Sequence, residues 1–315
     1  YLQIVGGFCI LNALIPICSS YLRAFGFSKE PLYASIIGNV INFCLNAFFL
    51  FVLHKGVAGV ATATVISRII NLVIVVLLGA VLVKAKQHPE RESNRAVMGQ
   101  IIRIGLPSAC ETAIYNVSMT LVIRFLNQMD AQGLNVTARS YTMQITNFSY
   151  CVGAALAQAN AIMTGWHIGA KEYDACDRGT KKAAVIGVIV AVILETVFTL
   201  CSGWIMQLFS KDPQMVSLVG KLLAIDIVLE IGRVTNLVYG QALKTSGDAV
   251  FPVVMGACFM ILCSVGGTYL FGIRLGLLAV GAYIGMTGDE CVRAVGMYLR
   301  WKSGKWKEKG LVKSR

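Results

Sequence analysis

The sequence has few charged residues and few histidines. Only 14% of its 315 residues are Asp, Glu, Lys or Arg, and only three are His. A typical soluble domain carries roughly 25% charged residues. Together with an apolar content of 56% and a mean hydropathy of +0.69, this composition excludes a disordered chain and argues against a soluble globular protein.

Motifs of metal-binding, nucleotide-binding and hydrolytic proteins are absent from the sequence. None of the ten cysteines forms a C-x-x-C pair and nine lie inside apolar stretches, so we interpret them as packing residues and expect no metal centre. The chain has no G-x-x-x-x-G-K-[ST] loop and no G-x-S-x-G elbow. The first absence is typical of a transporter not driven by ATP, and the second argues against an enzyme.

Long apolar segments dominate the chain instead. A bilayer-crossing helix needs about 20 mostly apolar residues. Nine segments qualify, namely 1–20, 31–53, 57–83, 104–123, 140–170, 183–210, 222–243, 249–273 and 275–299. Pro31, Pro107 and Pro252 lie near segment starts, where a proline suits the first helical turn because its missing N–H would have no partner there. The predicted fold class is an all-α polytopic membrane helix bundle.

Basic residues are unevenly distributed among the connecting segments. If segment 84–97 is cytoplasmic and the sides alternate from there, most Lys and Arg residues lie on the cytoplasmic side, as the positive-inside rule requires. We therefore expect an inner or plasma membrane protein with this linker and the C-terminus in the cytoplasm. The basic tail 302–315 is interpreted as a topological anchor, not as a nucleic-acid patch.

Two parts of the sequence repeat with an offset of 221 residues. Leu22 to Gly26, followed by Pro31, match Leu243 to Gly247, followed by Pro252, and we interpret these glycines and prolines as structural. Only the second copy is preceded by three further segments. This pattern predicts two pseudo-symmetric six-helix lobes with the first three helices of the N-terminal lobe absent; the alternative is a native nine-helix protein.

The repeat divides the chain into four parts. Residues 1–83 form the second half of the N-terminal lobe, and residues 84–97 form the linker between the lobes. Residues 98–301 form the C-terminal lobe, and residues 302–315 form the basic tail.

Several motifs resemble one transporter family. They are the helix opening Ile104-Gly105-Leu106-Pro107-Ser108-Ala109, the run Gly165-Trp166-His167-Ile168-Gly169-Ala170-Lys171, the turn Leu243-Lys244-Thr245-Ser246-Gly247-Asp248, and the polar pair Asn42 and Asn46. Together they resemble the multidrug and toxic compound extrusion (MATE) transporters over essentially the whole chain, as helices four to twelve of twelve.

This resemblance implies a secondary active antiporter that acts as a monomer. It would export cationic or amphiphilic small molecules in exchange for H⁺ or Na⁺, by rocker-switch alternating access and without a cofactor. A flippase for lipid-linked saccharides of the same superfamily is the alternative, and it would favour basic cavity residues. The sequence contains no set of catalytic residues inside the apolar segments, which argues against a membrane-embedded enzyme. A helical remnant that does not transport is a further alternative.

Charged residues inside the apolar segments are the candidate site, because a charge in the bilayer interior is costly and marks function by default. Asp226, Glu230 and Arg233 share one face of segment 222–243. A carboxylate there could bind either a proton or a cationic cargo molecule. Competition between the two would give exchange of the proton for the cargo. The alternative is a buried structural pair in which Arg233 neutralises Glu230 or Asp226.

The family resemblance adds three polar positions to this candidate site. Glu111 lies one turn after Pro107, and some family members carry the corresponding acid one turn later, where this chain has Tyr115. Asn42 and Asn46 match polar positions of the N-terminal lobe, but Asn46 replaces the aspartate of some members and cannot titrate. We therefore expect ion coupling in the C-terminal lobe.

The remaining buried charges are interpreted as packing groups. Glu195 stands alone in segment 183–210 and is predicted to be a packed or neutral acid. Asp289, Glu290 and Arg293 form a cluster in which Glu290 can pair with Arg293 one turn away, so we expect a self-neutralised cluster between helices.

Overall fold

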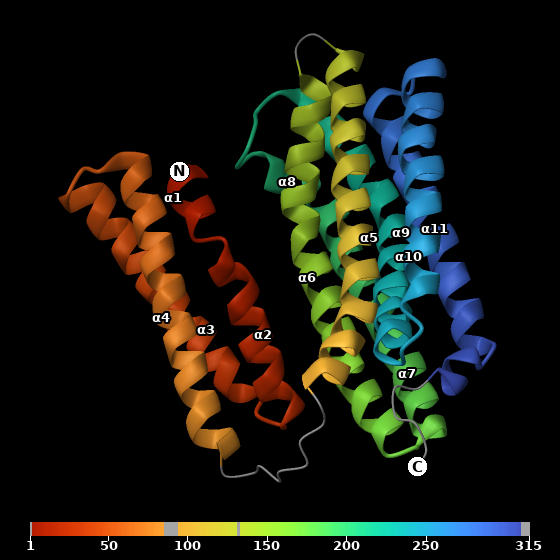
Figure 1. Cartoon of the computed structure of the whole chain (residues 1–315). Helices are drawn as coiled ribbons and strands as arrows, with labels where there is room; N and C mark the ends of the chain where they lie inside the picture. Colours follow the sequence, from red (N-terminus) through yellow and green to blue (C-terminus); the bar gives the residue numbers. More distant parts are fainter. Residues whose placement is uncertain (1, 85–93, 131–132, 310–315) are drawn as a thin grey trace. The chain divides into compact units, whose positions relative to one another are not determined.

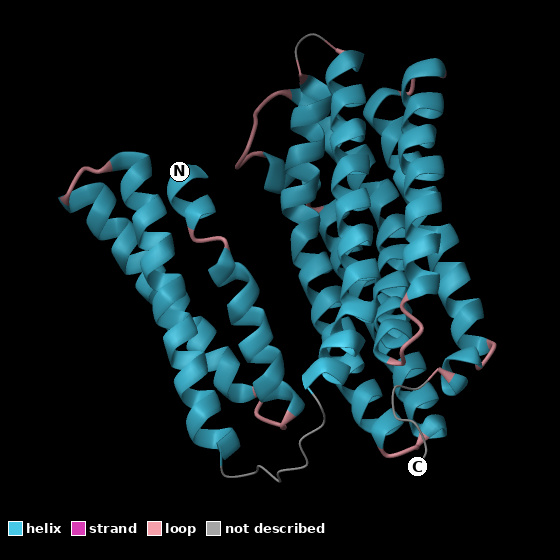
Figure 2. Ribbon diagram, viewed as in Figure 1, coloured by secondary structure: helices cyan, strands magenta, loops and turns pink. Residues whose placement is uncertain are grey.

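The computed structural model describes residues 2–84, 94–130 and 133–309. Every regular element in these ranges is a helix (Figure 2), which confirms the all-α class. The chain divides into two compact units, Tyr1–Glu92 (unit 1) and Ser93–Arg315 (unit 2). Most of the predicted linker 84–97 and the end of the predicted tail lie outside the described residues.

Unit 1 contains α1 (Leu2–Gly7), α2 (Ile10–Ala24), α3 (Lys29–Ala47) and α4 (Gly56–Lys84), and α3 continues as the π-helix η1 (Phe48–Val52) (Figure 1). Its small buried core contains Leu22, Ala34, Val75 and Val83. Most of its other apolar side chains point outward; Phe43 and Phe51, for example, are each 76% exposed. An apolar outer surface of this kind suits a helix bundle that is surrounded by lipid.

Unit 2 begins with α5 (Asn94–Met129), α6 (Leu134–Gly169), α7 (Tyr173–Leu200), α8 (Ser202–Met206) and α9 (Pro213–Thr245). It continues with α10 (Val250–Phe259), the π-helices η2 (Met260–Val265) and η3 (Thr268–Arg274), α11 (Leu278–Lys302) and the short 3₁₀ helix η4 (Lys305–Glu308). Helix α9 packs against α6, α7 and α11 and is the central helix of the unit (Figure 1).

Within the described residues, four helices are long and apolar enough to cross a membrane by length and composition alone: Lys29–Val52, Gly56–Val83, Tyr173–Leu200 and Val250–Arg274. Helices α6, α9 and α11 have 36, 33 and 25 residues, so they also have the length, but they bury polar and charged side chains. Buried polar residues on a spanning helix face the bundle or a cavity rather than lipid. The inner faces of these three helices therefore mark the interior of unit 2.

All nine predicted segments are helical, but several helix boundaries differ from the sequence prediction. The first segment is interrupted at Phe8 and Cys9, between α1 and α2. Pro107 was predicted to open a helix, and this is wrong, because α5 begins at Asn94 and contains Pro107 in its interior. Helix α6 begins at Leu134, earlier than predicted, because the Asp130 carboxylate accepts hydrogen bonds from the backbone N–H groups of Leu134 and Asn135, each at 3.0 Å.

The repeated turns have the same backbone geometry in both units. Gly26 has φ +90° and Gly247 has φ +91°. The N–H three residues beyond each helix end donates to a leucine carbonyl, from Phe27 to Leu22 at 3.0 Å and from Asp248 to Leu243 at 2.9 Å. This is a Schellman-type helix ending, and its left-handed position favours glycine. The repeat found in the sequence is therefore also a repeat of local structure.

The helix after each of these turns also ends in the same way. In unit 1, η1 closes with a wide turn in which Leu53 N–H donates to Phe48 O at 3.1 Å. In unit 2, η3 closes with Leu275 N–H donating to Leu270 O at 2.9 Å. The correspondence thus extends along α3 with η1 and along α10 with η2 and η3.

The Asp248 carboxylate, directly after the second repeated turn, ties the end of the described chain to unit 2. It is buried and accepts hydrogen bonds from Arg300 Nε and Lys309 Nζ, each at 2.7 Å. Trp306 stacks on Trp301 with ring centroids 4.2 Å apart. Burial alone would raise the pKa of Asp248, but the hydrogen bonds and charges of Arg300 and Lys309 outweigh it and hold the pKa below its usual value.

Replacing Gly26 should destabilise unit 1, and replacing Gly247 should destabilise unit 2, in each case only because the residue has a left-handed backbone conformation. A Cβ at Gly26 or Gly247 meets no atom within 4 Å, so Gly26→Ala and Gly247→Ala should each cost about 1–2 kcal/mol for the left-handed residue. Helical Gly79 and Gly288 also have free space, and alanine there should stabilise by about 0.5–1 kcal/mol. Thermal unfolding in detergent measures all four, and equal effects at the turn and control positions would contradict this account.

The Asp248 contacts should make stability depend on acid pH. A carboxyl whose folded pKa is depressed contributes stability above its unfolded pKa, and that contribution is lost as pH falls through the folded value. Wild-type protein should therefore lose melting temperature between about pH 5 and 3, and Asp248→Asn should melt lower at pH 7 but lose less on acidification. Asp174→Asn, at an exposed position, is the control, and an unchanged acid slope in Asp248→Asn would refute the contribution.

Candidate functional site

Unit 2 contains a cavity of about 550 Å³, lined by residues of α5, α6, α9, α11 and the α10–η2 segment. Its size falls within the usual range of small-molecule sites, roughly 300–1,000 Å³. Tyrosines, methionines and asparagines provide much of the wall, including Tyr115, Tyr150 and Asn147. A wall with aromatic, thioether and amide groups can contact an amphiphilic molecule on both its apolar and its polar side.

The cavity wall carries equal numbers of acidic and basic side chains. The acids are Glu111, Asp226, Asp289 and Glu290, and the bases are Arg139, Arg233, Lys244 and Arg293. The sequence analysis singled out the acids, but the structure places as many cations beside them. Arguments about cargo charge therefore depend on which of these groups are already paired.

Glu111 is paired with a residue of the repeated turn. Its Oε2 lies 2.6 Å from Lys244 Nζ, and both side chains are largely buried. Gly256 leaves room for the pair, because a Cβ there would lie 3.3 Å from Glu111 Oε1. Tyr115, one turn further along α5, also lines the cavity and is 41% exposed. Glu111 thus lines the cavity with a cationic partner that the sequence analysis did not assign.

A second network joins α11 to α9. Arg293 binds Asp289 through two hydrogen bonds, at 2.8 and 2.9 Å, and Glu290 at 3.0 Å. Glu290 also accepts a hydrogen bond from Asn236 Nδ2 at 3.0 Å and lies 3.7 Å from Arg233 Nε. The expected pairing within the cluster is present, but the cluster is not separate from the charges of α9.

On α9 itself, Arg233 forms an ion pair with Glu230, as one of the two alternatives from the sequence required. Glu230 is fully buried and does not line the cavity, whereas Asp226 does and is 2% exposed. Asp226 Oδ2 has no hydrogen-bond partner among the described residues. Asp226 is therefore a carboxylate in the cavity wall that no arginine or lysine of the described chain neutralises directly.

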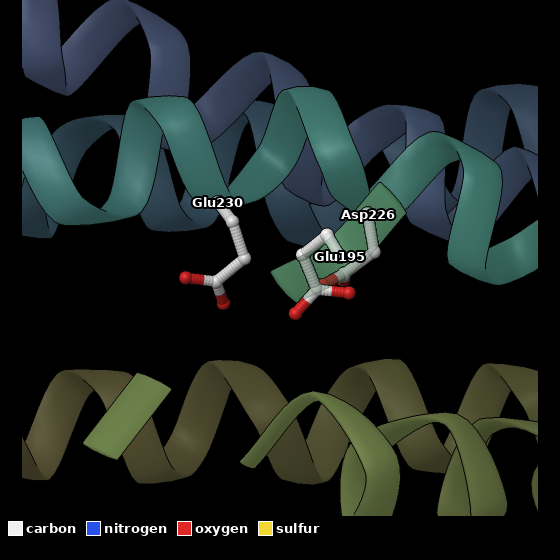
Figure 3. Close-up of side chains that lie close together, drawn as sticks. All are labelled: Glu195, Asp226 and Glu230. Atoms are coloured by element: carbon white, nitrogen blue, oxygen red, sulfur yellow. The ribbon is translucent and has the colours of Figure 1, made fainter. Parts of the chain in front are cut away.

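Glu195 is the only acid of its own segment, but in the structure it lies beside two acids of α9. Carboxylate oxygens of Glu195, Asp226 and Glu230 all lie within 4.8 Å of one another (Figure 3). Glu195 comes from α7, which packs against α9, and is fully buried. Glu195 belongs to one helix, and Asp226 and Glu230 belong to another. The cluster can therefore be recognised only when the packing of α7 against α9 is known.

Arg139 directly precedes the predicted segment 140–170, and the sequence analysis did not include it among the candidate site residues. It lies in α6, is 7% exposed and lines the cavity. Its Nη2 contacts the sulfur of Met119 at 3.6 Å, and its Nε has no hydrogen-bond partner among the described residues. The available signal was Asp130, whose acceptor side chain before an apolar run marks a helix start ahead of Arg139.

The asparagine pair lies in unit 1 and connects α3 to α4. Asn42 Nδ2 donates to Ser67 Oγ at 3.1 Å, and Asn46 Nδ2 donates to Asn42 Oδ1 at 3.0 Å. Pro31 lies in the first turn of α3, and Pro252 lies in the first turn of α10. The asparagine pair is a neutral hydrogen-bonded link between helices.

Comparison with known proteins supports the resemblance noted in the sequence. Residues 107–270 match the family model MatE. The chain is 33% identical to the uncharacterized transporter YisQ of Bacillus subtilis, over 99% of this chain and 70% of that protein. It is 21% identical to the probable multidrug resistance protein NorM of Thermotoga maritima, over 99% of this chain and 68% of that protein.

Solved structures show the same fold. An outward-facing multidrug resistance MATE family transporter of the MOP superfamily superposes with a TM-score of 0.86 at 18% identity, over 98% of this chain and 70% of the other. A crystal structure of MATE in the bent conformation gives a TM-score of 0.84 at 18% identity, over 98% of this chain and 69% of the other. The chain therefore belongs to the MatE family of multi-pass membrane transporters, as the motifs around Pro107, Gly165 and Gly247 predict, and it is not an enzyme.

Proposed function

We propose that the protein is a secondary active antiporter that exports cationic or amphiphilic small molecules in exchange for H⁺ or Na⁺. Cargo binds in the unit 2 cavity, and the coupling ion binds at Asp226 and its acidic neighbours. The spans rock between inward and outward openings around this site. The observation that carries the proposal is the buried, incompletely partnered Asp226 carboxylate in the cavity wall.

Among the acidic groups of the cavity wall, Asp226 is the one that supports cationic cargo, because the described residues give it no direct ion pair. Lys244 is held by Glu111, and Arg293 is held by Asp289 and Glu290. Asp226 keeps an oxygen free for a ligand. A cation that enters the cavity loses water of hydration, and the ionised Asp226 carboxylate compensates for this loss by attracting it. Protonation of Asp226 removes this attraction. Mutually exclusive occupancy of one carboxylate is the basis of exchange.

Orientation in the membrane follows from the basic residues. We infer that the protein lies in the inner or plasma membrane as a single chain, with the segment 84–97 and the C-terminus in the cytoplasm. The positive-inside rule supports this orientation, as does the basic composition of residues 300–315. The neutral asparagine pair of unit 1 supports placing the coupling ion in unit 2.

The flippase alternative also has one observation in its favour. Arg139 lines the cavity, and its Nε has no hydrogen-bond partner among the described residues. A guanidinium group with an unused N–H donor suits a phosphate-bearing lipid-linked saccharide. The two candidates therefore differ in which side chain cargo requires, Asp226 for a cation or Arg139 for an anion.

Removing the charge of Asp226 should abolish export. In an efflux-deficient host that expresses the complete reading frame, Asp226→Asn should reduce export of a cationic dye by roughly tenfold or more, because the membrane-interior charge is the functional group. Asp174→Asn, exposed at the start of α7, is the matched control. Loss of wild-type export on adding an uncoupler identifies H⁺, and loss on removing sodium identifies Na⁺. Normal dye export by well-folded Asp226→Asn would sink the proposal, whereas export lost in Arg139→Gln instead would favour the flippase.

A charge swap separates structural pairing from coupling at Glu111. Glu111→Gln should destabilise the protein by about 1–3 kcal/mol, because it leaves Lys244 largely buried and unpaired. The double variant Glu111→Lys with Lys244→Glu restores the ion pair and should recover the melting temperature. If Glu111 also contributes to coupling, the swapped protein stays defective in dye export; full recovery of export would show that the pair is only structural.

A further inference from the structure

Arg139 is the basic residue of the cavity wall that the described chain leaves without an anionic partner. The other three basic side chains of the wall are ion-paired: Lys244 with Glu111, Arg293 with Asp289, and Arg233 with Glu230. Arg139 makes no ion pair with any residue in the described ranges, and its Nε has no hydrogen-bond partner there. Its charge is therefore left for a molecule that enters the cavity.

The surroundings of Arg139 do not compensate for its burial. The residue is only 7% exposed, and a guanidinium group keeps its charge in a protein and carries five N–H donors. Its Nη2 contacts the sulfur of Met119 at 3.6 Å, and a thioether sulfur is a weak acceptor. A buried cation without a counter-ion is costly. An anionic group in the cavity would remove this cost and accept charge-assisted hydrogen bonds.

Asp226 lines the same cavity but is not the ion-pair partner of Arg139. The Tyr283 side chain of α11 interacts electrostatically with both residues, so both act on one part of the cavity. The guanidinium group that acts most on Asp226 is nevertheless that of Arg233, which is already paired with Glu230. The cavity therefore presents an acid on α9 and a base on α6, and each has hydrogen-bonding capacity that the described residues do not use.

The α6 wall around Arg139 suits the remainder of an acidic ligand. Arg139, Met143, Asn147 and Tyr150 follow one another at steps of three or four residues and all line the cavity, as residues on one helix face do. Asn147 and Tyr150 carry neutral N–H and O–H donors, and Met143 offers polarizable apolar surface. This face therefore combines a positive charge, neutral donors and apolar surface, which together suit a molecule with an acid group and an apolar body.

The charges of the two walls favour a carboxylate over a phosphate. A carboxylate has one negative charge, and it matches the planar guanidinium group through two parallel N–H···O bonds. A phosphate monoester has close to two negative charges at neutral pH, so Arg139 alone would not balance it and Asp226 would repel the excess. Asp226 in turn attracts a positive group. A molecule with one amine and one carboxylate would leave neither wall unpaired.

We propose that Arg139 is a carboxylate-binding residue of the cargo site and gives the protein a preference for amphiphilic cargo that carries a carboxylate as well as a cationic group. The cationic group binds at Asp226 on α9, and the carboxylate binds at Arg139 on α6. This inference rests on the proposed function, in which cargo occupies this cavity. It differs from the flippase alternative because both residues act on the same molecule, so a phosphate-bearing lipid without an amine would not satisfy the site.

Two dyes that differ only at the carboxyl group test this role of Arg139. A rhodamine with a free carboxyl group and the methyl ester of the same dye share one cationic ring system. Protein purified from the complete reading frame should bind the free acid roughly tenfold more tightly than the ester, measured by fluorescence anisotropy. Arg139→Gln should lose this preference. It should bind the ester at least as well as wild type does, because a repelling positive charge is gone.

Three further variants control the measurement. Arg139→Lys keeps the charge without the planar fork and should retain only part of the preference for the acid. Asp226→Asn should weaken the binding of both dyes, because both carry the cationic ring system. Arg124→Gln, at an exposed position of α5, should behave as wild type.

Equal binding of the two dyes by wild type would overturn the proposal. A loss of affinity by the same factor for both dyes in Arg139→Gln would also overturn it, since Arg139 would then only support the site. If Arg139→Gln does not fold, the ratio of the two affinities in wild type and in Arg139→Lys decides. Tighter binding of dodecyl phosphate than of the acid dye would reject the carboxylate preference in favour of the flippase.

Dye export measured in parallel separates this inference from the antiporter proposal. Export of the ester that needs Asp226, without a preference for the acid in binding, refutes only the role of Arg139. A preference for the acid in binding, without export of either dye, refutes only the antiporter.

Discussion

Charges in the interior of unit 2 must be balanced by their neighbours, because an isolated ion away from water is unstable unless it is paired or neutralised. Helix α9 carries both signs, and three helices packed against it contribute further buried charges: Arg139 from α6, Glu195 from α7, and Asp289, Glu290 and Arg293 from α11. The packing of α9 therefore determines which charges are neutralised and which remain available. A shift of one helix against α9 would change these partners, so the charge balance of the interior depends on how the helices pack.

This dependence explains which parts of the structure could be predicted from the sequence. The nine helical segments and the turns at Gly26 and Gly247 were predicted correctly, because hydropathy and a left-handed backbone position are local properties. The cluster of Glu195 with Asp226 was missed, because it requires the relative rotation and depth of α7 and α9. A residue that stands alone in its own segment is not alone in a bundle, and hydropathy does not show which helices meet.

Helix boundaries failed for a different reason. The apolar pattern begins near Ile104, because the preceding residues include Arg95, Gln100 and Arg103. Helix α5 nevertheless starts at Asn94, since a helix can continue beyond the apolar layer wherever its backbone hydrogen bonds are retained. Pro107 then lies inside the helix, where it lacks a donor for the preceding turn and favours a bend. Counting apolar residues therefore locates a span but not the ends of its helix.

The repeat suggests why the charged chemistry is concentrated in unit 2. In unit 1, Asn42 of α3 binds Ser67 of α4 at 3.1 Å, and in unit 2, Ser264 of η2 binds Asp289 of α11 at 3.0 Å. Both bonds join the two helical segments that follow the repeated turn, and both span 25 residues. One pair is neutral, whereas the other includes a carboxylate that requires Arg293. The same scaffold thus links its helices through a neutral amide in one unit and through an ion-paired carboxylate in the other.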